Sequence, residues 1–344
     1  MANAANSVLL AGQVQFNERM LGAEWKLPDC AAVKAAGLAE MANPSLREIR
    51  TSESRTMTAK FPIRQAQTGG VVRVASHTGN NPDTDTETIT WSKFVEDFSI
   101  GFSLADNNVF EWAQLYAAAR RNAVYNLINR VDASFAASLL TDESTANAGG
   151  ANGTFNAATD EFEIDALYAD NFYGEVAAML RQNNYRGQLV GIVDAKAGTL
   201  ADRLGRDGAG NAVNTSAQLI PYSAIVPTTR TLAASVHDGS GLFYQNGLVG
   251  VNFWTPPKNR GTINFAQASF DSIGQFGQFM VPEFPGVEFA HSIYAARSDQ
   301  SAAGGDEQDI LIHEEVSLEM AYVSAPVSTF HTETSPVFTA ILLT

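Results

Sequence analysis

The triplet His313-Glu314-Glu315 begins like a zinc-protease motif. The HExxH motif needs a second histidine one helical turn after the first, and the residue at that place is Ser317. The surrounding residues alternate between apolar and polar, which is the pattern of a strand and not of a helix. A zinc site is therefore not predicted here.

The acids Asp83, Asp85 and Glu87 alternate with threonines, as in a calcium-binding loop. The next position is Thr88, where such a loop needs glycine for its sharp turn, and no glutamate stands at the twelfth loop position. We expect a solvated, turn-forming tip over residues 76–88, with weak cation binding as the alternative.

Two glycine-rich segments could suggest phosphate binding or acyl transfer. Gly205–Gly210 lacks the GK[ST] ending of a phosphate loop and follows a predicted helix instead of a strand. Asp238–Gly241 places aspartate where the G-x-S-x-G frame of a nucleophile elbow needs glycine. Neither chemistry is predicted.

The remaining reactive side chains are scattered. A catalytic centre would have to be assembled from groups with no motif spacing: Asp194, His237, Glu283 and His291. Cys30 is the only cysteine, so it forms no internal disulfide and is expected to be a small packing residue. The sequence thus predicts no catalytic residue, no cofactor and no metal site, and the chain is not expected to be an enzyme.

The composition is that of a folded chain. Its 344 residues are 45% hydrophobic and 17% charged, which excludes disordered and collagen-like classes. No uncharged apolar run is long enough to span a membrane, and the first residues lack the basic start and apolar core of a secretion signal. We therefore expect the chain inside a cell or a particle.

The net charge of −15 is unevenly distributed. Residues 131–344 hold 9 basic and 24 acidic side chains, whereas residues 1–80 hold 9 basic and 6 acidic ones. A basic arm thus precedes an acidic body. No helix-turn-helix or zinc-finger spacing accompanies it, so a sequence-specific DNA reader is not predicted.

The strongest periodicity lies in residues 107–140. Asn108 and Glu111 have capping-box spacing, apolar residues recur at helical spacing, and no glycine or proline interrupts the segment. A helix of this length spans about 50 Å. We expect a spine helix that crosses the molecule.

A second long element is predicted near the end of the chain. Residues 310–323 alternate apolar and polar side chains, as in a strand of about 48 Å. Glu314 interrupts the apolar face, and a β-bulge or an edge position would explain it.

The other segments predict smaller elements. Asp29 should cap a short alanine-rich helix. Two extended stretches on either side of the polar tip should pair as a hairpin over residues 58–102. A helix over about 165–182, a buried strand at 188–193 and a helix capped by Asp194 and closed by Gly205 indicate an α/β layer. Strands and hairpin turns, including Asn246-Gly247, follow up to residue 265.

This order of parts resembles the Hong Kong 97-like fold of tailed double-stranded DNA phage major capsid proteins, which encapsulins share. The resemblance implies an α+β fold with an N-terminal arm, an extended hairpin loop, a long spine helix in a peripheral domain and an α/β axial domain. The implied boundaries are 1–57 for the arm, 58–102 for the hairpin loop, 103–164 for the peripheral domain with the spine helix, 165–300 for the axial domain and 301–344 for strands that return to the peripheral domain.

The resemblance also implies a role. Many copies would form pentamers and hexamers and then a closed icosahedral shell around double-stranded DNA, which is bound without sequence specificity. Scaffolding, portal and decoration proteins are candidate partners, no membrane is involved, and the location would be the virion after assembly in the host cytoplasm. Candidate contacts between copies are the charged residues of the hairpin loop: Lys60, Arg64, Arg73, Glu96 and Asp97. An encapsulin-like shell protein and an intracellular α+β enzyme are the alternatives.

Overall fold

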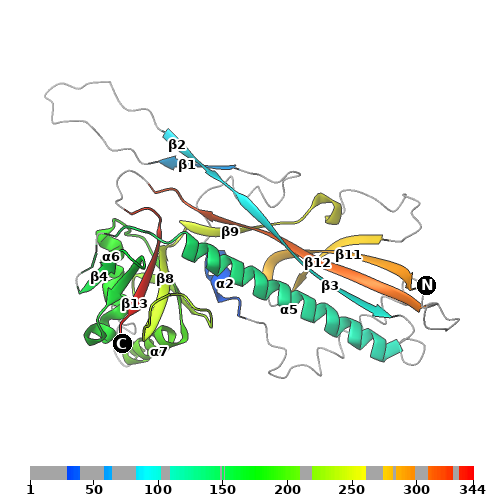
Figure 1. The fold of residues 1–344 in the computed structure, drawn as a ribbon, viewed down its shortest axis with the longest axis horizontal. Coiled ribbons are helices and arrows are strands. Elements are labelled where there is room, and N and C mark those ends of the chain that lie inside the picture. The colour runs from blue at the N-terminus through cyan, green and yellow to red at the C-terminus, as the bar shows by residue number, and fades with distance from the viewer. Residues whose placement is uncertain are drawn as a thin grey trace. The chain divides into compact units, whose positions relative to one another are not determined.

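A computed structural model describes residues 29–38, 58–63, 83–101, 109–147, 149–150, 152–209, 219–260, 274–281, 284–298, 309–327 and 333–344 (Figure 1). The chain forms two compact units. Unit 1 comprises Met1–Pro28, Trp91–Val131 and Phe253–Met320, and unit 2 comprises Asp29–Thr90, Asp132–Asn252 and Ala321–Thr344. Long elements contribute residues to both units.

A five-stranded sheet holds the longest strands. Four strands lie in the order β10-β11-β12-β3, and β9 also pairs with β12. Their bounds are Thr90–Gly101 for β3, Val249–Trp254 for β9, Gly274–Val281 for β10, Phe284–Ser298 for β11 and Asp309–Ser324 for β12. β12 therefore has neighbours on both sides.

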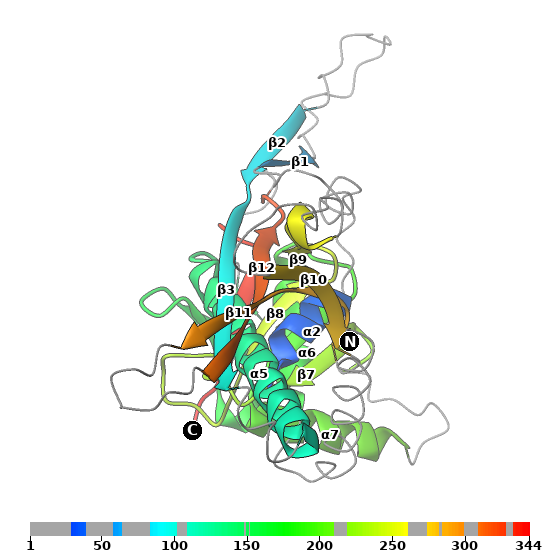
Figure 2. The same ribbon diagram turned by 90° about the vertical axis from the view of Figure 1, so that its right-hand side faces the viewer.

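Helix α5 (Val109–Thr141) runs alongside β3 and β12 (Figures 1 and 2). Its residues Trp112 and Tyr116 pack on Phe98 of β3 and Ile312 of β12. The ring planes of Trp112 and Tyr116 are stacked with centroids 5.5 Å apart. None of the helices within the described part of the chain is long and apolar enough to cross a membrane.

Unit 2 is built on a six-stranded sheet in the order β4-β5-β13-β8-β6-β7. The strands are β4 (Gly153–Asn156), β5 (Glu161–Ile164), β6 (Leu189–Val193), β7 (Tyr222–Pro227), β8 (Gly239–Gln245) and β13 (Val337–Leu342). A 3-10 helix η2 (Ala166–Asn171) leads into α6 (Phe172–Gln182), and α7 (Ala195–Ala209) follows β6. Helices α6 and α7 pack on the sheet through a core whose rings meet edge to face, namely Phe172, Tyr173, Tyr222 and Phe243.

Two small elements complete the described part of the fold. Helix α2 (Ala31–Leu38) is rich in alanine and contacts β6 and β7. Strands β1 (Thr58–Ile63) and β2 (Asp83–Thr88) form a separate two-stranded antiparallel sheet, in which Phe61 lies opposite Asp85. A 3-10 turn, η3 (Pro257–Asn259), follows β9.

The elements with long periodicity are confirmed. The helix predicted at 107–140 is α5, and the strand predicted at 310–323 is β12. Asp29 caps α2 as expected, because its Oδ1 accepts a hydrogen bond of 3.1 Å from the backbone N–H of Ala31.

The predicted polar tip is wrong for residues 83–88. These residues form β2 and pair with β1, so they are not a turn and not a calcium-type loop. The alternating threonines favour a strand, because their branched side chains suit a pleated surface. The second half of the predicted hairpin pairs elsewhere, since β3 lies beside β12.

Three smaller predictions also need correction. Asn246-Gly247 forms a turn, with Gly247 at φ 88°, but β8 and β9 on either side of it belong to different sheets. Helix α7 continues past Gly205 to Ala209. Residues 141–160, whose small and polar side chains predict a loop or an inserted tip, contain β4.

Candidate functional site

The first candidate is a buried carboxylate in unit 1. Glu314 is 1% exposed and occupies an interior position of β12, in regular register opposite Ile293 of β11. The prediction of a bulge or an edge position is therefore wrong. A charge inside a sheet needs partners, and α5 and β11 supply them.

Three side chains converge on Glu314. The hydroxyl of Tyr116 donates to Glu314 Oε2. Arg120 Nε lies 3.2 Å from Oε1 as an ion pair, and His291 Nδ1 lies 3.3 Å from the same oxygen. The Arg120 guanidinium also stands over the ring of Phe279 at 4.2 Å from its centroid. This cluster joins the helix to the sheet.

Burial, and then the negative charge of Glu314, raise the pKa of the Tyr116 hydroxyl well above its ordinary value. The phenol therefore keeps its proton and remains a donor. The positive charge of Arg120 balances the negative charge of the Glu314 carboxylate inside the fold. Because the Tyr116 hydroxyl stays protonated, it does not act as a base.

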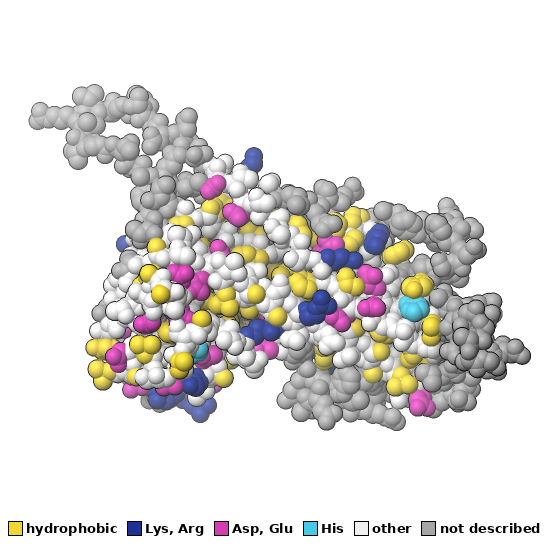
Figure 3. Space-filling view, in the orientation of Figure 1, with side chains coloured by type: hydrophobic (Ala, Val, Ile, Leu, Met, Phe, Trp, Pro, Cys, Tyr) yellow, Lys and Arg dark blue, Asp and Glu magenta, His cyan; other side chains and the backbone are white. Residues whose placement is uncertain are grey.

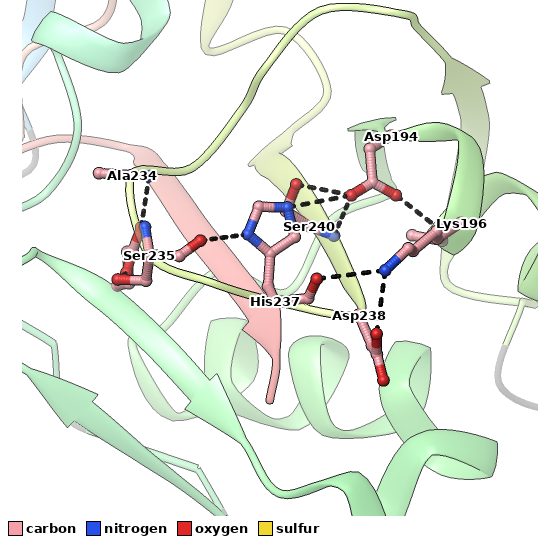
Figure 4. Close-up of polar contacts among 9 residues, drawn as sticks. Asp194, Lys196, Ala234, Ser235, His237, Asp238 and Ser240 are labelled. Atoms are coloured by element: carbon pink, nitrogen blue, oxygen red, sulfur yellow. Dashed lines mark hydrogen bonds and ion pairs between the residues drawn. The ribbon is translucent and has the colours of Figure 1, made fainter. Parts of the chain in front are cut away.

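The second candidate brings together two residues that sequence analysis left scattered. In unit 2, His237 Nε2 lies 3.4 Å from Asp194 Oδ2, and His237 Nδ1 lies 2.5 Å from the backbone oxygen of Ser235 (Figure 4). Ser240 Oγ lies 2.9 Å from the same Asp194 oxygen. A serine, a histidine and an aspartate thus lie within one cluster.

Its geometry is not that of a catalytic triad. In a triad the serine bonds to the histidine, whereas the Ser240 hydroxyl donates to Asp194. Asp194 also accepts backbone N–H bonds from Ala197 at 2.8 Å and from Ser240 at 2.7 Å, so it caps α7 and ties β8 to it. Ser240 is fully buried. The cluster fixes the loop before β8, and it activates no nucleophile.

A pocket of about 170 Å³ lies beside this cluster in unit 2. Apolar side chains of α6, α7 and β13 form its floor, and two ion pairs stand at its rim. Lys196 Nζ lies 2.9 Å from Asp238 Oδ1, and Arg203 pairs with Asp170. An apolar hollow with a charged rim suits an apolar group that approaches from outside the unit.

A third polar cluster fastens α2 within unit 2. Asp132, which is fully buried, accepts from the backbone N–H of Val33 at 3.0 Å and from Arg230 Nε at 2.5 Å. Asp29 accepts from the hydroxyls of Thr228 at 2.6 Å and Thr229 at 2.9 Å. Each carboxylate thus joins the α2 segment to residues distant in the sequence.

The two carboxyl groups respond differently to burial. Burial alone would raise the pKa of Asp29, but hydrogen bonds from Thr228, Thr229 and Ala31 outweigh it, so this pKa lies below its ordinary value. Burial dominates at Asp132 and raises its pKa, although Val33 and Arg230 oppose the shift. Both contacts are structural, because each carboxylate is enclosed by partners of its own chain.

No group of three or more histidine, cysteine, aspartate or glutamate side chains within the described ranges could hold a metal ion. His313 stacks on Tyr294 at 4.7 Å between ring centroids. Cys30 is buried in the α2 segment, and burial raises the pKa of its thiol.

Comparisons with known proteins concern the fold. A chain from Mycobacterium phage Cain is similar, with a TM-score of 0.50 and 10% identity over 94% of this chain and 93% of that one. A chain from Mycobacterium phage Che8 has a TM-score of 0.46 and 13% identity over 89% and 90%, and one from the capsid of a native GTA particle has 0.44 and 11% over 93% and 92%. No protein-family model matches the chain, and no curated protein matches it.

The chain has the Hong Kong 97-like fold of tailed-phage major capsid proteins. Of these three likenesses, the one to the phage Cain chain carries the assignment of the fold, because its TM-score is 0.50 and those of the other two are lower.

The capsid fold gives places to part of the predicted contact set. Lys60 is exposed on β1. Arg64 and Arg73 lie outside the described residues. Contact of any of the three with a neighbouring copy stays a prediction.

The two acidic members of that set lie on β3. Asp97 is exposed, whereas Glu96 already has a partner in its own chain. Arg130 of α5 approaches Glu96 Oε1 to 2.5 Å and donates to the backbone oxygen of Val95 at 3.0 Å. Glu96 is therefore a weaker candidate than Asp97 for pairing with another copy.

Sequence analysis missed Tyr116 and Arg120 as the partners of Glu314. A signal existed, because residues four apart on a helix share a face, and Arg120 interrupts the apolar face to which Tyr116 belongs. Glu314 likewise interrupts the apolar face of its strand. The basic residue on the helix and the acidic residue on the strand could therefore have been predicted to pair.

Proposed function

We propose that this chain is a major capsid protein, whose copies assemble into capsomers and then into a closed icosahedral shell around double-stranded DNA. The observation that carries the proposal is the likeness to the phage Cain chain over nearly the whole length of both chains. In the encapsulin-like alternative, the same fold would form a shell that encloses enzymes instead of DNA.

The β1–β2 sheet supports a role in assembly. It has two strands of six residues each and forms a sheet of its own. Ala59 and Phe61 of β1 are already buried within the chain, whereas Lys60 between them is exposed. A two-stranded sheet is marginally stable in water, and its exposed face gains stability when another surface covers it. We infer that the segment 58–102 includes an extended loop that a neighbouring copy covers.

Each ion pair between copies would add little to the stability of the shell. Acidic and basic side chains are interspersed on the face drawn in Figure 3. An exposed ion pair contributes about 0–1 kcal/mol. Lys60 and Asp97, with Arg64 and Arg73, would therefore act through the number of copies, while strand pairing and apolar contacts supply most of the stability.

The distribution of charge suits an enclosed polyanion. Residues 1–80 have three more basic than acidic side chains, and residues 131–344 have fifteen more acidic than basic ones. We infer that the basic N-terminal part of the chain (residues 1–80), whose excess charge comes from Lys60, Arg64 and Arg73, reduces the repulsion between the shell and DNA phosphates without reading bases. Pentamers and hexamers are the assembly units, with scaffolding, portal and decoration proteins as further partners, assembly in the host cytoplasm and a final place in the virion capsid.

An enzymatic alternative would need the cluster of Asp194, His237 and Ser240. The carboxylate in that cluster is occupied by two backbone N–H groups and a hydroxyl, and the serine is buried. No described feature of this cluster favours catalysis over support.

Sedimentation velocity combined with negative-stain microscopy tests the proposal on purified native material. We expect closed shells tens of nanometres across, or pentameric and hexameric capsomers. A uniform monomer or small dimer at every concentration, and also after co-expression with a scaffolding protein, would overturn the capsid function. Shells filled with enzyme instead of DNA would favour the encapsulin-like alternative.

A further inference from the structure

Strand β10 lies at an edge of the five-stranded sheet. In the described part of the chain it pairs with β11 and with no other strand, in regular antiparallel register from Gly274 to Met280. Its outer edge, on the side away from β11, presents backbone N–H and C=O groups that can pair with another chain. Natural proteins protect such edges with charged residues, proline, short strands or a covering element. An edge without these protections is therefore a candidate interaction surface.

The other edges among the described strands each have one of these protections. β3 carries Lys93, Glu96 and Asp97. β9 is buried at every residue, β4 has four residues, and β7 is contacted by α2 and α7. In the separate two-stranded sheet, β1 contains a lysine and a proline, and β2 contains three acids.

Among the described residues, β10 has no such protection. Its eight residues, GQFGQFMV, include no charged residue and no proline. Turn η3 contacts β10 through Asn259, whose Nδ2 donates to the backbone oxygens of Gly277 on β10 and of His291 on β11 at 3.1 and 2.9 Å. Because Asn259 bonds to both strands, it lies over the β10–β11 pair and not along the outer edge.

The two faces of β10 differ. Phe279 packs inside unit 1, where its ring stacks on Phe289 at 5.6 Å between centroids. Phe276, Gln278 and Met280 lie on the other face, because residues two apart on a strand share a face. All three are exposed, Phe276 at 41% and Met280 at 64%. β10 thus presents an uncharged, mostly apolar face next to its outer edge.

We propose that β10 of one copy of the chain pairs antiparallel with β10 of a second copy, so that the two sheets join across a two-fold axis. A second copy supplies an edge with the same lack of protection. Two uncharged strands also meet without repulsion, although each chain carries a net charge of −15. The inference deepens the proposed function and rests on it, since it names one contact through which copies associate.

The exposed residues select the register of this pairing. Two-fold pairing centred on Gln278 places Phe276 of each copy opposite Met280 of the other, and Gln278 opposite Gln278. Methionine sulfur makes favourable contacts with aromatic rings, and two side-chain amides can hydrogen-bond to each other. Pairing centred on Gly277 would separate Phe276 from Met280. The register centred on Gln278 therefore covers both exposed apolar side chains.

Disulfide formation tests the pairing and its register. Gln278→Cys is made in a Cys30→Ala chain, which removes the only natural cysteine, and the chains are assembled, oxidised and separated without reductant. We expect a disulfide-linked dimer, because directly opposite residues of an antiparallel pair have Cα atoms about 4.5–5.5 Å apart, within the range that a disulfide spans. The matched control is Ser92→Cys in the same background, since Ser92 is exposed on β3 at the opposite edge of the same sheet.

Charge substitutions at the same position give an independent measurement. Gln278→Lys alone, or Gln278→Glu alone, places two like charges opposite each other at the axis, and each should weaken self-association about fivefold in sedimentation. An equimolar mixture of the two variants places opposite charges there and should restore association. Restoration on mixing shows that the single variants are folded, and circular dichroism of each unassembled variant verifies it.

The outcomes separate the contact from the function. If wild-type shells form and Gln278→Cys chains cross-link no more than Ser92→Cys chains, the β10 pairing is wrong and the capsid function stands. If Gln278→Cys dimers form and no shell ever forms, the pairing stands and the capsid function is wrong.

Two further results would overturn the pairing. One is protection of the β10 amides from hydrogen exchange in shells that show no Gln278→Cys cross-link, which would mean that another segment or another protein covers the edge. The other is a mixture of Gln278→Lys and Gln278→Glu chains that associates no better than either variant alone.

Discussion

Glu314 and Glu315 are neighbours on β12 in opposite surroundings. Glu314 is buried against Tyr116 and Arg120, whereas Glu315 forms an ion pair of 3.3 Å with Lys93, in which both side chains are more than 40% exposed. Removing one partner of a buried pair leaves an uncompensated charge, which costs about 3–5 kcal/mol. We predict that Glu314→Ala lowers the free energy of unfolding of the unassembled chain by about 3 kcal/mol, measured by urea titration.

The adjacent residue provides the control. Glu315→Ala should cost less than about 1 kcal/mol, because solvent screens the exposed pair. Glu314→Gln should lie between the two, since an amide oxygen still accepts from Tyr116 but carries no charge for Arg120. Equal losses for Glu314→Ala and Glu315→Ala would contradict the assigned role of the buried cluster.

Glu143 predicts a pH dependence at the scale of one residue. Burial, followed by the charges of Asp160 and Glu161, raises the pKa of Glu143 from 4.5 to about 7. The folded chain therefore holds this proton between those two pH values and the unfolded chain does not. The contribution to the free energy of unfolding is complete below pH 4.5 and falls as the pH rises to about 7. Because Glu143 is only partly buried and solvent screens its charge, the loss is about 1–2 kcal/mol.

Glu143→Gln tests this sign, because the amide imitates the protonated carboxyl group. We predict that the variant unfolds at a higher urea concentration than the wild type at pH 8 and at nearly the same concentration at pH 4. The pH 4 comparison is the control for packing effects. A variant that is less stable at pH 8 than the wild type would show that the ionised carboxylate is the preferred form.

At the scale of elements, α2 depends on contacts outside its own turns. It has eight residues, which is too short to be stable alone, and Asp132 and Arg230 fasten its first turn. We predict that Arg230→Ala lowers the hydrogen-exchange protection of the Val33 amide at least about tenfold, because α2 then opens locally. Mass spectrometry or NMR of the unassembled chain measures it.

Lys34→Ala is the matched control on the same helix. Lys34 is exposed between buried neighbours of α2, so its truncation keeps the Asp132–Arg230 contact and should preserve exchange protection. If the Val33 amide is equally protected from exchange in the Arg230→Ala and Lys34→Ala variants, the Asp132–Arg230 contact does not hold α2 in place.

Elements could be predicted from the sequence where their pattern is local. The helical period of α5 and the alternation of β12 extend over several turns or many residues, so neighbours in sequence suffice to define them. Pairing partners are not local. β3 was expected to close a hairpin and lies beside β12, and β9 follows a hairpin turn yet leaves the sheet of β8. Such choices depend on which apolar faces meet in the folded chain.

The candidate sites were less predictable for the same reason. Glu314 finds its hydroxyl donor 198 positions away, and Asp132 finds its arginine 98 positions away. No motif spacing describes such pairs, because the fold and not the local chain sets their distance. His237 and Asp194 have no motif spacing, yet the fold brings them within 3.4 Å of each other. Asp194 accepts a hydrogen bond from the backbone N–H of Ala197, so the pair supports a loop.

The net charge of the whole chain predicts that assembly depends on salt concentration. Each chain carries a net charge of −15, and fifteen more acidic than basic side chains lie in residues 131–344, which form most of the folded body. Copies that approach one another therefore repel, with a range of about 30 Å at 0.01 M salt and about 8 Å at 0.15 M. Apolar contacts between copies change little over this range of chloride concentration.

We therefore predict that the protein concentration needed for half-assembly falls as NaCl rises from 0.01 to 0.15 M, as read by light scattering and sedimentation. KCl at equal ionic strength should give the same curve, because screening does not depend on the cation. Disassembly on raising salt would instead mean that ion pairs between copies, such as those of Lys60 and Asp97, outweigh the net repulsion.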